Sequence, residues 1–362
     1  MSMTSRKDPP VAVRPVSHLG MARRVRPMNT RDIALLGSAV AAGLALTWIV
    51  YSRLLPFQGL QGFLLCWVAS FLAIYYAALR ETDGKVIARD RVMTALISIM
   101  AVGVVVPLAI IVVYVMVKGL RYLHFAFFTT TMASIGPSAS ASQSGGLQAI
   151  VGTIEQVGIA MAISVPLGVM TAVYLNEVHG RLRRPVRIFV DAMSGVPSIV
   201  AGLFIYSVLV ANGGQFSGFA AAIALSILML PTVTRTSEVV LRLVPDGLRE
   251  ASLAMGAPEW RTVWGVVLPT ARSGIITAMI LGVARVIGET APLLMTSLGN
   301  PDLNLNPFSG PQASLPLASF KLFTSSQQAD VARAWVFAAV LLMLVLVLFV
   351  LARRSARNQF GR

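Results

Sequence analysis

The feature of this sequence that most limits its fold is a series of eight apolar stretches, each close to or beyond the length that crosses a lipid bilayer. A transmembrane helix needs roughly 20 consecutive apolar residues. The stretches lie at 33–51, 60–79, 93–117, 148–175, 186–210, 218–234, 273–297 and 334–352. Only 12% of the 362 residues are charged, against roughly 25% in soluble domains. The sequence therefore predicts an all-α membrane protein with eight transmembrane helices, and it excludes a soluble domain.

The basic residues predict how the chain is oriented. Lys and Arg concentrate in the cytoplasmic loops of membrane proteins, and this chain has 30 of them and a net charge of +15. With both termini cytoplasmic, most of them lie inside, and Arg285 falls within the membrane. Those left outside are Arg53, Lys118, Arg121, Lys321 and Arg333. Because basic segments are attracted to anionic lipid, the charge predicts membrane lipid, not nucleic acid, as the partner of the two tails.

Several classes of chemistry lack the residues they need. Cys66 is the only cysteine, and the histidines are scattered at His18, His124 and His179, so neither a disulfide nor a Cys/His metal site is expected. An intramembrane enzyme, such as a lipid phosphatase, would need a nucleophile or metal cluster that the sequence does not offer. The sequence also lacks a Gly-x-x-x-x-Gly-Lys-[Ser/Thr] phosphate loop. We therefore expect no catalytic residue, metal or cofactor in this chain, and ATP with Mg²⁺ only on another polypeptide.

The apolar stretches divide the chain into four parts. Residues 1–32 form a basic tail, and 33–92 form a two-helix transmembrane hairpin with a basic linker. Residues 93–352 form a six-helix body, and 353–362 form a second tail. For the hairpin we expect a lipid-facing or assembly role. The outer loops 118–147 and 298–333 are too polar to cross a membrane, and they are either flexible connectors or a surface for an external partner.

A polar segment, residues 245–270, interrupts the body between the apolar stretches 218–234 and 273–297. It reads as two short helices separated by Gly256, which can adopt the left-handed conformation that ends a helix. Asp246 is predicted to be the N-cap of the first helix, and Pro258 suits the first turn of the second. Such a unit between two spans predicts a docking element for a soluble partner.

Arg285 and Glu289 form the second polar feature. They lie four residues apart, so they share one face of the seventh predicted helix. A charge at the centre of a membrane helix costs about 2.5–3.5 kcal/mol on insertion scales, and such residues usually line an interior path. The planar guanidinium suits an anion with several oxygens. The alternative is an ion pair that only holds helices together.

Glu289 adds a hypothesis about selectivity. Hydrogen phosphate has a proton to donate to a carboxylate, whereas sulfate has none, so a buried acceptor would reject sulfate by placing charge against charge. The hydroxyls of Ser198 and Thr290 could donate further hydrogen bonds to an oxyanion, although hydroxyls in membrane helices often bond to the backbone instead.

The spacing within 245–270 resembles a known signature. Glu250-Ala251-Ser252, Gly256, Val266 and Leu268-Pro269 are similar to the EAA loop of ABC-importer permeases, from whose usual Ala and Ile Ser252 and Val266 depart. In that family the loop is a coupling helix that docks on a separate ATPase. The resemblance therefore implies coupling roles for Arg249, Glu250, Ala251, Gly256, Leu268 and Pro269.

Four further runs resemble phosphate-specific permeases of the PstA type. They are Arg285–Leu294, Leu230–Glu238, Leu243–Ala251 and Gly195–Gly202. The resemblance covers roughly 93–352 and implies a type I ABC-importer core of six helices in a bacterial inner or plasma membrane. It also implies that Arg235, with Arg285 and Glu289, acts in transport.

The partners that this resemblance implies are a homologous permease, forming a heterodimer, an ABC ATPase dimer and an external phosphate-binding protein. A permease for another oxyanion, such as sulfate or molybdate, is the nearest alternative, and the Gly288-Glu289-Thr290 run argues against it. A sensor or scaffold is another, since sensing and transport do not exclude each other.

Overall fold

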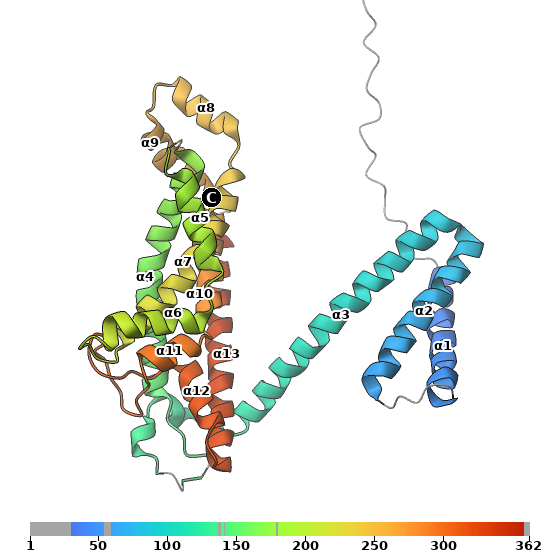
Figure 1. Ribbon diagram of the computed structural model, residues 1–362, viewed down its shortest axis with the longest axis horizontal. Helices are drawn as coiled ribbons and strands as arrows, with labels where there is room; N and C mark the ends of the chain where they lie inside the picture. The colour runs from blue at the N-terminus through green and yellow to red at the C-terminus, as the bar shows by residue number, and fades with distance from the viewer. Residues whose placement is uncertain (1–29, 54–58, 137–138, 141, 179, 358–362) are drawn as a thin grey trace, which may run out of the picture. The chain divides into compact units, whose positions relative to one another are not determined.

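The computed structural model describes residues 30–53, 59–136, 139–140, 142–178 and 180–357 (Figure 1). Most of the first predicted tail and the last residues of the second lie outside these ranges. The regular elements within them are all helical, apart from one isolated bridge between Leu298 and Gln312. By length and composition, seven of these helices are suited to cross a membrane, or eight if one bent pair counts as a single span. The chain divides into two compact units, residues 1–109 and 110–362.

The N-terminal unit is built on a hairpin of α1 (Thr30–Arg53) and α2 (Leu60–Asp83). The two helices approach closely because Gly43 has no side chain: a Cβ there would lie 2.9 Å from the Phe71 backbone. The next helix, α3 (Lys85–Leu120), is continuous over 36 residues. Its first turns pair with α1 through Arg91 and Asp32, at 2.6 Å. The predicted basic linker therefore consists of the end of α2, a glycine and the start of α3.

The C-terminal unit is organised around α4 (Leu147–Glu177) and α7 (Gly218–Arg242). Ser164 Oγ of α4 donates to the Ser226 carbonyl of α7 at 3.1 Å. About two turns further along α4 and about four turns further along α7, Ala172 and Leu241 belong to one apolar cluster. These contacts advance together along both helices, so α4 and α7 run parallel. The chain between them must therefore return to the end at which α4 begins.

The segment between α4 and α7 is not the single helix expected over 186–210. It consists of α5 (Arg183–Ser194) and α6 (Ser198–Ile205), which continues as a π-turn, η3 (Tyr206–Val210). The two parts are bent by 103°. Pro197 explains the break, because proline has no backbone N–H and excludes the residue before it from helical conformation.

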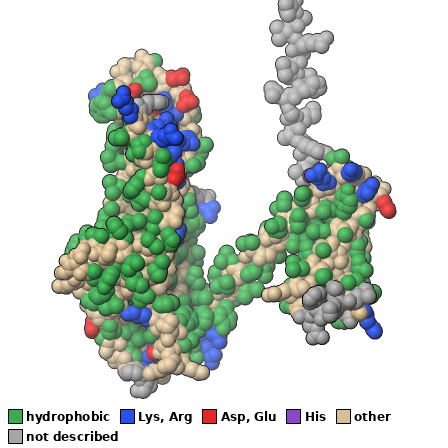
Figure 2. Space-filling view, in the orientation of Figure 1, with side chains coloured by type: hydrophobic (Ala, Val, Ile, Leu, Met, Phe, Trp, Pro, Cys, Tyr) green, Lys and Arg blue, Asp and Glu red, His purple; other side chains and the backbone are tan. Residues whose placement is uncertain are grey.

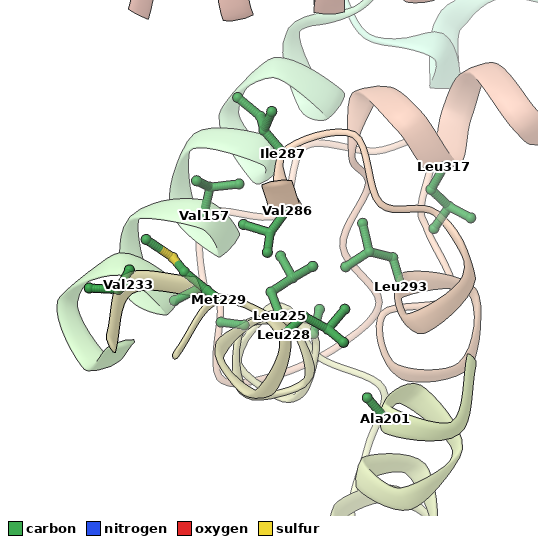
Figure 3. Close-up of a cluster of buried hydrophobic side chains, with 13 residues drawn as sticks. Val157, Ala201, Leu225, Leu228, Met229, Val233, Val286, Ile287, Leu293 and Leu317 are labelled. Atoms are coloured by element: carbon green, nitrogen blue, oxygen red, sulfur yellow. The ribbon is translucent and has the colours of Figure 1, made fainter. Parts of the chain in front are cut away.

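The helix expected over 273–297 is also broken. The coupling segment contains α8 (Asp246–Ala254), α9 (Glu259–Thr262) and a π-turn, η4 (Val263–Val267), which leads into α10 (Leu268–Val286). After a turn, α11 (Ala291–Thr296) packs against α6, where a Cβ on Gly202 would lie 2.5 Å from Pro292 Cα. Figure 3 shows the apolar core where α4, α6, α7, α10, α11 and α12 (Leu315–Phe323) converge.

The loops expected on the outer side contain short helices within their described parts. Two short 3₁₀ turns, η1 (Phe125–Phe128) and η2 (Met132–Ser134), precede α4, and α12 precedes the last helix, α13 (Gln328–Arg357). The side chain of Arg333 is only 1% exposed. It donates to the carbonyls of Ala139, Ser140 and Gln143 and to Asp330. One buried cation thus fastens the Ser/Gly-rich loop to the start of α13.

We predict that Gly202→Ala destabilises the protein, because the added methyl group would meet the Pro292 backbone. Overpacking of this kind costs about 1–3 kcal/mol. Gly158→Ala is the matched control, since a Cβ on Gly158 of α4 meets nothing within 4 Å. Thermal unfolding in detergent would measure both. An equal melting temperature for the two variants would show that the α6–α11 contact does not limit stability.

Candidate functional site

Arg285 and Glu289 meet where α10 ends. Arg285 lies in the last turn of α10, and Glu289 lies in the turn before α11. The backbone N–H of Glu289 donates to the Val286 carbonyl at 3.0 Å. Arg285 Nη1 donates to Glu289 Oε1. The predicted contact is therefore present, although the helix that was expected to carry both residues stops between them.

The pair keeps capacity for another ligand. The Arg285 side chain is 50% exposed and that of Glu289 is 16% exposed. A guanidinium carries five N–H donors, and the contact with Glu289 uses one of them. An anion with several oxygens can thus bind Arg285 beside Glu289, or it can take the place of the Glu289 carboxylate on the guanidinium.

Ser198 and Thr290 lie at the starts of the two short helices. Ser198 is the first residue of α6, and Thr290 directly precedes α11. The close approach of Gly202 to Pro292 brings the backbones of these helices together. Within the described residues, no hydrogen bond joins either hydroxyl to Arg285. The structure thus brings α6 and α11 together, but it shows no contact between these two hydroxyls and Arg285 in the described residues.

Arg235 belongs to a different cluster. It donates to Glu238, four residues before the end of α7, at 2.8 Å and to Asp191 of α5. Glu238 is 3% exposed and also accepts from Arg187, at 2.8 Å, and from Arg242. One buried carboxylate therefore contacts three arginines, of which Arg187 joins α5 to α7 directly and Arg235 does so through Asp191. The sequence carried a signal for it, because Glu238 lies three residues after Arg235 and four before Arg242.

The coupling segment differs from its prediction at the start of α8. Pro245 takes the N-cap position, and Asp246 lies in the first turn. The prediction of Asp246 as the cap is thus wrong: its carboxylate accepts from Arg249 Nη1 at 2.7 Å instead of capping the helix. Gly256 has a φ of 80°, as predicted. Ser252 Oγ and Thr262 Oγ1, 2.8 Å apart, join α8 to α9.

Arg249 faces inward rather than toward solvent. Its side chain is 17% exposed, and it donates to the carbonyls of Leu241 and Val244 at 2.9 and 2.8 Å. It also binds Glu177 at the end of α4. Arg249 therefore anchors α8 to the body. Sequence reasoning gave it a coupling role but could not find these partners.

The solvent-exposed surface of the coupling segment is partly apolar. Glu250, Ala251, Gly256 and Pro269 are exposed, whereas Leu268 is half-buried. Five large apolar side chains of the segment are also exposed, namely Leu248, Leu253, Met255, Trp260 and Trp264. In Figure 2, Lys and Arg side chains gather near this end of the unit, whereas apolar side chains cover its flank. The surface has the large apolar side chains that protein interfaces favour.

Comparison with known proteins shows the family. Residues 164–359 match the family described as binding-protein-dependent transport system inner membrane component. The chain is 41% identical over 260 residues to the phosphate transport system permease protein PstA 1 of Mycobacterium tuberculosis (strain CDC 1551 / Oshkosh), covering 71% of this chain and 85% of that protein. The chain belongs to the PstA family of phosphate permeases. Members of the PstA family are transport subunits rather than enzymes.

The chain is also similar to a second curated relative and to a solved structure. It is 40% identical over 239 residues to the PstA protein of Yersinia pestis, covering 65% of this chain and 79% of that protein. A solved structure of the MetNI methionine ABC transporter, in an inward-facing conformation, is 20% identical. It has a TM-score of 0.46 and covers 68% of this chain and 96% of that chain.

We predict that Glu238→Gln destabilises the protein, because three arginines would lose their common charged partner. Breaking a buried ion pair from one side costs about 3–5 kcal/mol. Asp191→Asn is the control, since Asp191 is 56% exposed and exposed ion pairs contribute about 1 kcal/mol or less. Chemical unfolding followed by fluorescence would compare them. Equal losses in the two variants would contradict a central role for Glu238.

Proposed function

We propose that this chain is the transmembrane permease subunit of an ATP-driven importer of inorganic phosphate. It forms the translocation path together with a second, homologous permease. Membership of the PstA family is the observation that carries this proposal. A polar Arg285–Glu289 pair, at a break in an otherwise apolar helix, supports it.

The membrane topology that we propose has eight crossings and both termini in the cytoplasm. The parallel course of α4 and α7 supports it, since α5 and α6 together must then recross the membrane. The type I importer core would comprise six crossings, namely α3, α4, α5 with α6, α7, α9 with α10, and α13. The α1–α2 hairpin is additional to them. In this topology α8 faces the cytoplasm, and the protein lies in a bacterial inner or plasma membrane.

We assign the two ends of the C-terminal unit to different partners. The exposed backbone and side chains of Glu250, Ala251 and Gly256, with the exposed apolar side chains beside them, would dock on an ABC ATPase dimer, which holds ATP and Mg²⁺. The outer loops would receive phosphate from an external binding protein. The ordered contacts of Arg333 favour a shaped docking surface over a flexible connector.

In the path that we propose, phosphate would bind arginine side chains that lie beside carboxylates. Arg285 offers donors beside Glu289, so hydrogen phosphate can bind the guanidinium while donating its proton to the carboxylate. Sulfate lacks that proton and would face Glu289 charge to charge. Thr290 and Ser198 would add hydroxyl donors. Arg235 is already paired with Glu238 and Asp191, so we assign it a later contact with phosphate.

We predict that Arg285→Gln lowers ATP-driven phosphate uptake by at least about tenfold, the effect expected for losing one charge-assisted contact. Vesicles would contain the chain with its partner permease, ATPase and binding protein. Arg184→Gln, which changes an exposed arginine of α5, is the control. Unchanged uptake in the Arg285 variant would reduce the pair to a structural contact.

Glu289→Gln tests selectivity in the same vesicles. The neutral amide can donate to an oxyanion, so we expect unlabelled sulfate to begin competing with labelled phosphate. Sulfate should not compete in the unchanged protein. A Glu289 variant that excludes sulfate as well as before would refute the selectivity hypothesis, and competition in the unchanged protein would favour a broader oxyanion permease.

We predict that Trp260→Ala weakens capture of the ATPase by about tenfold, because buried aromatic side chains contribute strongly to interfaces. Trp260 is 62% exposed in the chain alone. Trp48→Ala is the matched control, since Trp48 of α1 is 65% exposed. Co-purification in detergent at several ATPase concentrations gives the measurement. Equal capture by both variants would move the docking surface away from α9.

A further inference from the structure

The Arg249 side chain joins the coupling segment to the end of α4. Its Nε donates to Glu177 Oε2 at 3.2 Å, and its Nη2 donates to Glu177 Oε1 at 3.0 Å. Asn176 Nδ2 donates to the same carboxylate at 2.7 Å. The Glu177 side chain is only 12% exposed. A contact made at two points fixes orientation as well as distance, so α8 and α4 are held in one geometry at this point.

The other end of α4 holds the outer segment that precedes α12. Gln156 Nε2 donates to Gln312 Oε1 and to the Ala313 carbonyl, at 3.1 and 3.3 Å. Thr153 Oγ1 accepts from the Leu315 backbone at 2.8 Å. Gln156 and Gln312 are both buried. The outer segment is therefore fixed to α4 by several buried hydrogen bonds.

These two attachments belong to one continuous helix. Between Gln156 and Glu177, α4 extends about 30 Å at 1.5 Å per residue. Toward the C-terminus, the covalent route from α8 runs through α9, a π-turn and α10, and α10 ends at the turn that holds Glu289. Toward the N-terminus, α7 also reaches the outer segment as a single helix, since its Gly218 lies against the Gln312 side chain. The route through α4 differs because the Arg249–Glu177 side-chain contact joins it to α8, so a single substitution can break it.

We propose that Glu177 and Arg249 are positioning residues that transmit movement of the coupling segment to α4, and through α4 to the outer segment 312–315. The inference rests on the proposed function, since the movement comes from an ATPase docked on α8. Arg249 then acts within the chain and need not touch the ATPase. Loss of the pair should disconnect ATP hydrolysis from transport without removing the docking surface.

Glu177→Ala tests the proposal in proteoliposomes that hold the full chain, partner permease, ATPase and binding protein. It removes the link to α4 and leaves Arg249 bonded to Leu241, Val244 and Asp246. Asp246→Ala is the matched control, because it removes a carboxylate from the same guanidinium without touching α4. Co-purification of the ATPase, ATP hydrolysis with and without binding protein, and phosphate taken up per ATP are measured for each.

We expect Glu177→Ala to keep ATPase capture and basal hydrolysis, and to lower phosphate uptake per ATP by about tenfold, within the usual range of coupling between sites. Asp246→Ala should keep all three values. Glu177→Asp, which restores the charge with a shorter reach, should recover part of the uptake ratio. Parallel loss of capture and hydrolysis in Glu177→Ala would show that the pair only holds α8 in place. An unchanged ratio would show that coupling bypasses α4, and either result overturns the proposal.

Failure of the proposed function would give a different pattern. The unchanged complex would then hydrolyse ATP in response to its binding protein but accumulate no phosphate. The Glu177–Arg249 pair would still be tested in that case, because stimulation of ATP hydrolysis by an external protein requires communication across the membrane. Loss of that stimulation in Glu177→Ala, but not in Asp246→Ala, would support the pair whatever the substrate.

Discussion

The parallel contact between α4 and α7 determines most of this structure. Their backbones approach because small residues face each other: a Cβ on Gly168 would lie 2.9 Å from a Val233 methyl group. In a membrane, close packing and hydrogen bonds such as Ser164 to Ser226 replace the hydrophobic effect as the force between helices. Two parallel neighbours also require the chain between them to return, and the α5–α6 segment, bent at Pro197, makes this return.

The sequence predicted where the apolar helices lie better than where they break. Apolar runs gave the helices near 30–53, 60–83 and 147–177, because the period and length of a buried helix are local properties. The ends of α5 and α10 were missed, although Pro197 and Gly288 mark both. An apolar run hides such breaks, since hydropathy records composition and not backbone conformation. What keeps the breaks in place is the fit of Gly202 against Pro292, residues 90 positions apart in the sequence.

Among the polar contacts, those between residues close in the sequence could be predicted, and those between distant residues could not. Arg285 with Glu289, and Arg235 with Glu238, are contacts within one or two helical turns, and spacing alone suggests them. Arg249 with Glu177 spans 72 residues, and Gln156 with Gln312 spans 156. One sequence without relatives cannot reveal such pairs. The residue type was informative even so, because a half-buried arginine at the start of a polar loop needs acceptors, and the ends of α4 and α7 supply them.

The buried contacts of Arg333 have a consequence for biogenesis. Its carbonyl partners at Ala139 and Gln143 precede it by 194 and 190 residues, so they must wait through the synthesis of most later helices. The Ser/Gly-rich loop cannot take its final shape until the start of α13 has emerged from the ribosome. A helix synthesised late thus completes the loop that precedes α4.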